Sequence, residues 1–158
     1  MRILILEDDT HRREVMSECL LDRFPQFDVE YFRRAPDMIE RMEATGLEDV
    51  ILISLDHDLI FPEEEAKLID SGDGVDVANW LSEQSPVCPV IVQTTNNVEG
   101  DRMMERLNTS GWTTSRVVPY SDTKWIHERW RVLVREAIVQ GPRVEVSVPT
   151  EPDHSMTA

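Results

Sequence analysis

Short apolar runs alternate with amphipathic segments along most of the chain. The runs at residues 2–6, 50–55 and 89–93 are almost continuously apolar, which is typical of strands buried on both faces of a sheet. Looser runs at 27–32 and 116–120 predict two more strands. In the segments between them, apolar residues recur every three or four positions, as they do on the buried face of a helix. The pattern therefore predicts alternating strands and helices.

Capping and turn residues support this division. Thr10 is expected to cap the first helix, Pro36 to open the second and Gly100 to relax the turn into the fourth. The third helix is expected over 75–81 and the last over 125–138. Five strands alternating with five helices predict an α/β fold of flavodoxin-like order. This fold is a three-layer sandwich, with helices on both faces of a five-stranded parallel sheet. Ligands of such sheets bind at the carboxyl ends of the strands, so we expect the site where the first, third and fourth strands end.

The length and composition suit one domain. A chain of 158 residues that is 41% hydrophobic can bury a sizeable core. We expect the domain to span residues 1–140. Residues 141–158 hold three prolines, scattered acids and few aromatic residues, and they are expected to form a flexible tail. The acidic segment 60–74 is interpreted either as a solvated surface loop or as a lid over the site.

Charge and composition exclude several classes of function. A formal net charge of -15 leaves no basic face that could wrap duplex nucleic acid. Cys19 and Cys88 lie in apolar segments without metal-binding spacing, so we expect buried, reduced thiols. The sequence has no signal-peptide pattern and no apolar run of about 20 residues, the length that spans a membrane. We expect a cytoplasmic protein that makes no membrane contact.

Acidic residues end two of the predicted strands. The first strand runs into Glu7 and Asp8, and the third into Asp56, His57 and Asp58. If these strands are parallel neighbours, the carboxylates of Glu7, Asp8 and Asp56 crowd one edge, and a cation would offset their repulsion. Oxygen ligands of this kind favour Mg²⁺ or Mn²⁺ over zinc. The alternative is an acidic edge exposed to solvent.

Several motifs carry a resemblance to known families. Residues 3–9 read Ile-Leu-Ile-Leu-Glu-Asp-Asp, and Asp56 ends the third predicted strand, which resembles the receiver domains of response regulators. Further motifs are Leu-Asp-His-Asp-Leu at 55–59, Gly-Val-Asp-Val at 74–77, Trp80-Leu81, and Thr95, Asn97 and Gly100. Together these are more similar to the cyclic-phosphate processing receiver domains. That resemblance implies metal-dependent hydrolysis of a cyclic phosphate, such as a cyclic nucleotide or a 2',3'-cyclic phosphate end.

Chemistry and resemblance together suggest roles for the remaining polar residues. Imidazole takes up and releases protons near neutral pH, so His57 with Asp58 is the candidate catalytic pair, unless His57 is satisfied within the structure. Thr95 and Asn97 are candidate phosphate contacts, unless they cap the following helix. The resemblance implies substrate binding by Asp76, which would otherwise favour the start of its helix electrostatically.

One departure from ordinary receivers bears on function. Their fifth strand ends in Lys-Pro, whereas Val118 precedes Pro119 here. Lys124 and Arg102 are candidates to supply the missing cation, although we expect both on the surface. The departure favours a hydrolase that acts on a small cyclic phosphate or nucleotide. The alternative is a receiver-type or degenerate receiver signalling module that binds phosphate or a partner protein.

Overall fold

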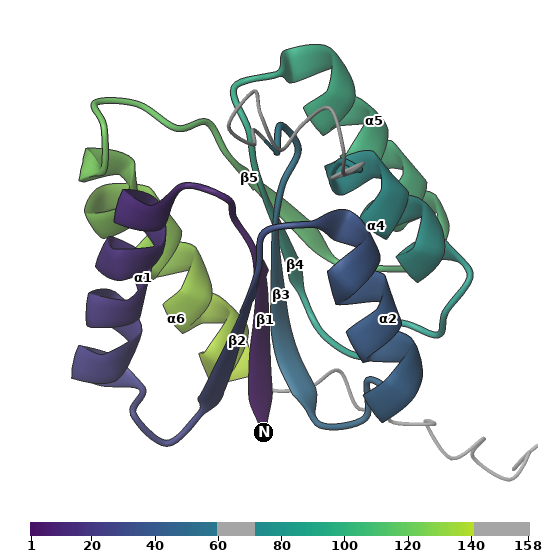
Figure 1. Cartoon of the computed structure of the whole chain (residues 1–158), viewed down its shortest axis with the longest axis horizontal. Helices are drawn as coiled ribbons and strands as arrows, with labels where there is room; N and C mark the ends of the chain where they lie inside the picture. The colour runs from purple at the N-terminus through teal and green to yellow at the C-terminus, as the bar shows by residue number, and fades with distance from the viewer. Residues whose placement is uncertain (60–71, 141–158) are drawn as a thin grey trace, which may run out of the picture.

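A computed structural model of the protein describes residues 1–59 and 72–140, which fold into three layers (Figure 1). A central sheet lies between two layers of helices. The strands are β1 (Arg2–Leu6), β2 (Asp28–Phe32), β3 (Val50–Asp56), β4 (Val90–Gln93) and β5 (Thr114–Val117). The helical elements are α1 (Thr10–Arg23), α2 (Ala35–Thr45), α4 (Gly74–Ser82), α5 (Asn97–Thr109), a π-helical turn η1 (Ile126–Trp130) and α6 (Arg131–Gln140).

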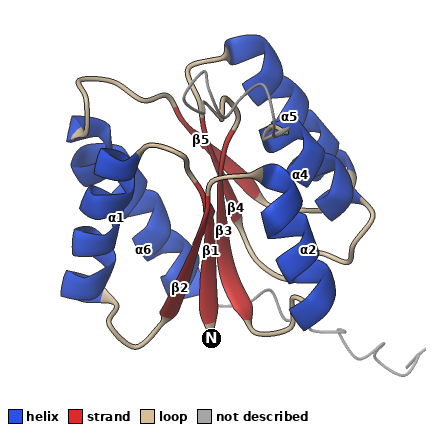
Figure 2. Cartoon of the chain, viewed as in Figure 1, coloured by secondary structure: helices blue, strands red, loops and turns tan. Residues whose placement is uncertain are grey.

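The sheet has the strand order β2-β1-β3-β4-β5, and every neighbouring pair is parallel. Helices α1 and α6 cover one face, and α2, α4 and α5 cover the other (Figure 2). This arrangement confirms the predicted flavodoxin-like fold. Because β1 and β3 are adjacent, their acidic ends meet at one edge of the sheet.

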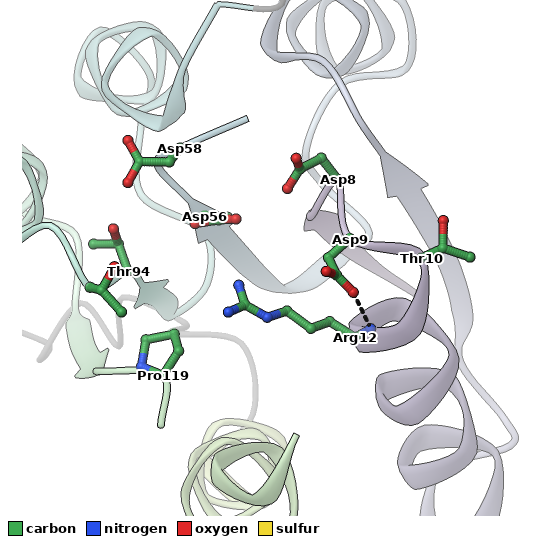
Figure 3. A pocket seen from close by; sticks show the side chains of 9 residues that line it. Asp8, Asp9, Thr10, Arg12, Asp56, Asp58, Thr94 and Pro119 are labelled. Carbon is green, nitrogen blue, oxygen red and sulfur yellow. Dashed lines mark hydrogen bonds between the residues drawn. The ribbon is translucent and has the colours of Figure 1, made fainter. Parts of the chain in front are cut away.

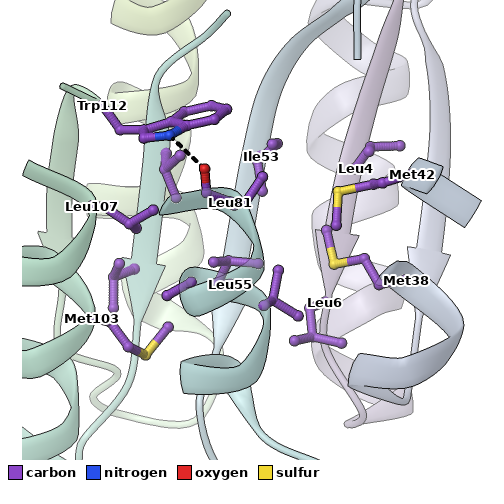
Figure 4. Packing of buried hydrophobic residues seen from close by; sticks show 14 of the residues in the cluster. Leu4, Leu6, Met38, Met42, Ile53, Leu55, Leu81, Met103, Leu107 and Trp112 are labelled. Carbon is purple, nitrogen blue, oxygen red and sulfur yellow. Dashed lines mark hydrogen bonds between the residues drawn. The ribbon is translucent and has the colours of Figure 1, made fainter. Parts of the chain in front are cut away.

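Side chains of the central strands alternate between two hydrophobic cores. In β1, Ile3 and Ile5 pack with α1 and α6, whereas Leu4 and Leu6 pack with α2 and α4. Figure 4 shows the second core, which continues under α5. All residues of β1, β3 and β4 are buried, as continuous apolar runs between two helical layers require.

Packing on both faces of the sheet determines the direction of the last side chains of β3. The pairing register between β1 and β3 shifts near the start of β1, and alternation is regular beyond that irregularity. Ser54 contacts Trp130 of η1, whereas Leu55 belongs to the core beneath α2 and α4. Alternation then turns Asp56, the last residue of β3, toward the layer of α1 and α6.

The first helix begins with a different cap from the one predicted. Asp9, rather than Thr10, holds the extended cap conformation, and its Oδ1 accepts a hydrogen bond from the Arg12 N–H at 2.9 Å. Thr10 is the first helical residue. An aspartate caps a helix at least as well as a threonine, so the sequence alone left the choice between neighbours open.

Gly100 has a different role from the predicted one. Helix α5 begins at Asn97 after the cap Asn96, which places Gly100 inside the helix rather than in the turn before it. A Cβ atom at Gly100 would lie 2.4 Å from the guanidinium carbon of Arg116. The glycine is therefore explained by the close approach of Arg116, not by backbone conformation.

The fifth strand and the last helix also differ in detail from the prediction. Strand β5 ends at Val117, and Pro119, which has no N–H for a ladder hydrogen bond, lies in the loop that follows. The predicted last helix forms without a break, but its first part, η1 (Ile126–Trp130), is π-helical and continues directly into α6. Local π geometry depends on packing and leaves no clear trace in hydrophobic spacing.

Two predicted segments lie outside the described residues. Residues 60–71 include most of the candidate lid, and residues 141–158 are the predicted tail. The domain boundary at residue 140 therefore stays a prediction. Among the residues that the structure describes, no helix combines the length and apolar character needed to cross a membrane.

Candidate functional site

Three carboxylates meet where β1 and β3 end. Glu7 and Asp8 directly follow β1, and Asp56 is the last residue of β3. One oxygen atom from each side chain lies within 4.8 Å of the other two. The parallel pairing of β1 with β3 brings these residues together, in the way that the strand pattern predicts.

Burial distinguishes this cluster from an ordinary acidic surface. Glu7 is fully buried and Asp56 is 4% exposed. Burial raises the pKa of Glu7 to about 7, although the charge of Arg12 opposes the rise. Burial, followed by the charges of Glu7 and Asp8, raises the pKa of Asp56 to about 9. The cluster without a cation therefore retains protons at neutral pH.

A pocket of about 510 Å³ opens beside the cluster (Figure 3). It is lined by residues from the ends of three strands, the start of α1 and the loop after β5: Asp8, Asp9, Thr10, Arg12, Asp56, Asp58, Thr94, Thr95 and Pro119. Among the predicted site residues, Asp8, Asp56, Asp58 and Thr95 thus share one cavity. Its position at the carboxyl edge of β1, β3 and β4 is the position expected for a ligand site in this fold.

Arg12 brings a positive charge into the pocket. Its side chain extends from the first turn of α1 toward Asp56 and Thr94 (Figure 3). Its Nη1 lies 3.7 Å from Oε1 of Glu7, and its guanidinium lies over the Trp125 ring. Sequence reasoning missed Arg12, because Trp125 is distant in the chain and no local motif links the two residues.

Polar contacts fix the loop between β4 and α5. The Thr94 hydroxyl accepts a hydrogen bond from the Asn96 N–H at 3.0 Å, and the Asn96 side chain caps α5. Arg116 of β5 donates to the Thr94 carbonyl at 3.0 Å and to Oδ1 of Asn97 at 3.2 Å. Asn97 therefore contacts Arg116 and does not line the pocket, whereas Thr95 does.

The candidate catalytic pair is split between the pocket wall and the protein interior. Asp58 lines the pocket, and its side chain is 51% exposed. His57, just beyond the end of β3, is 7% exposed and does not line the pocket. Its Nε2 lies 3.7 Å from Oδ1 of Asp58, and its buried Nδ1 has no hydrogen-bond partner among the described residues. Among the described residues that line the pocket, Asp58 is the one whose side chain lies next to the His57 ring.

Three other candidates lie away from the pocket. Asp76 forms a capping box with Asp73 at the start of α4, in which each side chain accepts a hydrogen bond from the other residue's N–H. The side chains of Lys124 and Arg102 are 63% and 62% exposed and pair with nearby glutamates. Their surface placement agrees with expectation, and the role of Asp76 in substrate binding stays a prediction.

The donor set of the cluster suits a hard divalent cation. Three carboxylates provide oxygen ligands at one point, and two of them are buried where unpaired charge is costly. Partial neutralisation by protons is one solution, and coordination of a cation is the other. The residues of the cluster therefore fit Mg²⁺ or a similar ion.

Solved structures with a similar fold are response-regulator receivers. A receiver domain from Rhodospirillum rubrum superposes with a TM-score of 0.65 at 16% identity, covering 92% of this chain and 99% of that one. The phosphorylated cyanobacterial phytochrome response regulator RcpA gives 0.63 at 16% identity, covering 88% and 94%. The beryllofluoride-activated NtrC4 receiver domain dimer gives 0.59 at 18% identity, covering 88% and 97%. At such identities the likeness concerns the fold.

The fold and the acidic pocket together define a receiver-like domain. A family model, the cyclic-phosphate processing receiver domain, matches residues 3–109, and the chain belongs to this family. No significant match was found among curated proteins. The family match agrees with the resemblance carried by the motifs around Asp56, Asp76 and Thr95.

Proposed function

We propose that this domain hydrolyses a small cyclic phosphate, such as a cyclic nucleotide or a 2',3'-cyclic phosphate end, with the help of Mg²⁺ or Mn²⁺. The observation that carries the proposal is the position of the cluster of Glu7, Asp8 and Asp56, two of them buried, beside a pocket that also contains Arg12. Such a pocket combines cation ligands with a donor for phosphate oxygens. When bound, the cation would polarise a phosphoryl oxygen and activate water.

Other residues of the pocket would bind the phosphate and transfer the proton. Arg12 would donate hydrogen bonds to the non-bridging phosphate oxygens, because its guanidinium is already desolvated on one side by Trp125. Thr95 would hold a further oxygen through its hydroxyl without adding charge. Asp58 would exchange the proton with the reacting oxygens, with His57 behind it as the group that replenishes or receives that proton.

Incubation of the purified protein with a panel of cyclic phosphates tests the proposal most directly. Each substrate is incubated with Mg²⁺, with Mn²⁺ and with a chelator, and phosphomonoester products are measured. The proposal expects that at least one substrate is hydrolysed, that this hydrolysis requires the cation, and that Asp56→Asn abolishes it. Absence of turnover across 2',3'-cyclic and 3',5'-cyclic substrates with either cation would refute the hydrolase proposal.

A second candidate function is that of a receiver-type signalling module. It is favoured by the place of Asp56 at the end of β3 and by the similarity in fold to receivers that are phosphorylated or beryllofluoride-activated according to their names. One of these receivers is a dimer, so a protein partner belongs to this candidate. The sequence after β5 argues against ordinary phosphoacceptor chemistry, because Val118 stands before Pro119 where receivers have a lysine, and the pocket contains Arg12 instead.

Labelling with acetyl phosphate separates the two candidates. The hydrolase proposal expects little stable labelling of Asp56, whereas the signalling candidate expects stoichiometric labelling that is acid-stable and base-labile. Asp58→Asn is the control, because it keeps the buried cluster intact while it changes an exposed pocket carboxylate.

A further inference from the structure

Two polar residues interrupt the apolar strands beneath the cluster. Ser54 of β3 and Gln93 of β4 are both 0% exposed. Burial of an amide or a hydroxyl is costly unless its hydrogen bonds are satisfied. Their contacts therefore need an explanation beyond the packing of the sheet.

The two residues belong to a chain of hydrogen bonds that ends on the carboxylate cluster. The indole Nε1 of Trp130 donates to the Ser54 hydroxyl at 3.0 Å. The Ser54 hydroxyl donates to Oε1 of Gln93. Nε2 of Gln93 donates to Oε2 of Glu7 at 3.1 Å. All four side chains are 0% exposed, so no solvent competes for these bonds.

The indole of Trp130 determines which group is donor and which is acceptor in each of these hydrogen bonds. An indole N–H can only donate, so the Ser54 oxygen accepts that bond and its single proton points to Gln93. The amide oxygen of Gln93 is thereby occupied, which leaves its NH₂ group to face Glu7. One oxygen of Glu7 is held by this amide, and the carboxylate is oriented beside Asp8 and Asp56.

We infer that Gln93 is a positioning residue for the cation site, and that Ser54 and Trp130 fix the orientation of its amide. The inference deepens the proposed function and rests on the metal site at Glu7, Asp8 and Asp56. Hydrogen-bonded partners behind a metal ligand orient that ligand and increase the affinity for the ion. Because Trp130 belongs to the π-helical turn η1, the same bonds connect the cation site to the helical layer of α6.

Magnesium affinity of variants tests the positioning role. Gln93→Met keeps an unbranched buried side chain but removes the amide, and calorimetric titration with MgCl₂ is expected to give an affinity about 10- to 100-fold weaker than wild type. Trp130→Phe should weaken binding less, because Ser54 can still donate to Gln93. The matched control is Trp112→Phe, which removes a buried indole hydrogen bond to the Leu81 carbonyl in the opposite core. We expect unchanged magnesium affinity in this control.

Nuclear magnetic resonance of the wild-type protein provides a readout that a purely structural role would not change. The indole N–H signal of Trp130 is assigned by its loss in Trp130→Phe. On titration with MgCl₂, this signal should shift with the same midpoint as the calorimetric binding curve, while the indole signal of Trp112 stays constant. In Gln93→Met, saturation with magnesium should leave the Trp130 signal in place.

The outcomes separate this inference from the proposed function. If the wild type does not bind magnesium, both the metal site and the positioning role are refuted. If the wild type binds magnesium but the Trp130 signal does not move, or a folded Gln93→Met binds equally well, only the positioning role is refuted. If Gln93→Met does not fold, the Trp130 signal of the wild type and the comparison of Trp130→Phe with Trp112→Phe decide the question.

Discussion

The guanidinium carbon of Arg12 lies 5.5 Å from the centroid of the Trp125 ring. Trp125 is fully buried, so the ring is a fixed platform for the longer and more flexible side chain. The contact directs the charge of Arg12 into the acidic pocket. The arginine side chain that lines the pocket therefore comes from α1.

Arg12→Gln should weaken the binding of a phosphate-containing ligand. Loss of hydrogen bonds between a charged donor and phosphate oxygens costs about 1.5 to 3 kcal/mol, which corresponds to a reduction in affinity of about one to two orders of magnitude. The measurement is binding of the best cyclic phosphate, or of inorganic phosphate, in the presence of Mg²⁺. Arg102→Gln removes the same charge from the exposed face of α5 and should have no effect. Equal losses in both variants would indicate a general charge effect.

Magnesium affinity should increase with pH. The pKa of Glu7 is about 7 and that of Asp56 about 9 in the cation-free protein, so binding at neutral pH must displace protons. Affinity should therefore rise between pH 6 and pH 9. Calorimetry in two buffers with different ionisation enthalpies would report the number of protons released. A constant affinity with no proton release would contradict the raised pKa values.

The stability of the cation-free protein should show the opposite trend. Because the pKa of Asp56 is raised on folding, the unfolded chain loses its proton first, and the free energy of unfolding falls as pH rises from about 4 toward 9. The loss is at most about 1.4 kcal/mol per pH unit for one group. Asp56→Asn should remove most of this slope and stabilise the cation-free protein at pH 8. Asp58→Asn is the control, since Asp58 is half exposed.

Thermal unfolding with and without Mg²⁺ measures this effect. The wild type should be stabilised by the cation, and Asp56→Asn should melt at a higher temperature than the cation-free wild type but gain little from Mg²⁺. A wild type whose stability rises from pH 5 to pH 8 without a cation would overturn the assignment of a buried, protonated Asp56.

The periodic features of the sequence were sufficient to predict the fold. Continuous apolar runs identified the three buried strands, and the strand order placed Glu7 and Asp56 at the ends of neighbouring strands. The carboxylate cluster followed from that order, because parallel strands end at one edge. These predictions succeeded since each depends on a pattern of many residues rather than on a single contact.

The features that escaped prediction depend on single contacts between distant segments. Arg12 enters the pocket where Trp125 lies beneath it, and Gly100 leaves room for the guanidinium of Arg116, which passes close to α5. Gln93 ends the apolar run at 89–93, and nothing in that pattern indicates that its amide is buried against Glu7. Neither spacing nor composition encodes such pairings, which arise only once the layers are packed.

The position of His57 behind Asp58 leads to the last prediction, which compares two variants. If His57 exchanges protons with the pocket through Asp58, His57→Gln and Asp58→Asn should each reduce turnover of the cyclic phosphate by about 10²- to 10⁴-fold, while magnesium binding is retained. The double variant should be no slower than the slower single variant, because the two residues would serve one proton path. Rates measured from pH 5 to pH 9, with folding checked by circular dichroism, provide the comparison. Wild-type turnover in His57→Gln across that range would remove His57 from the mechanism and leave Asp58 to act alone.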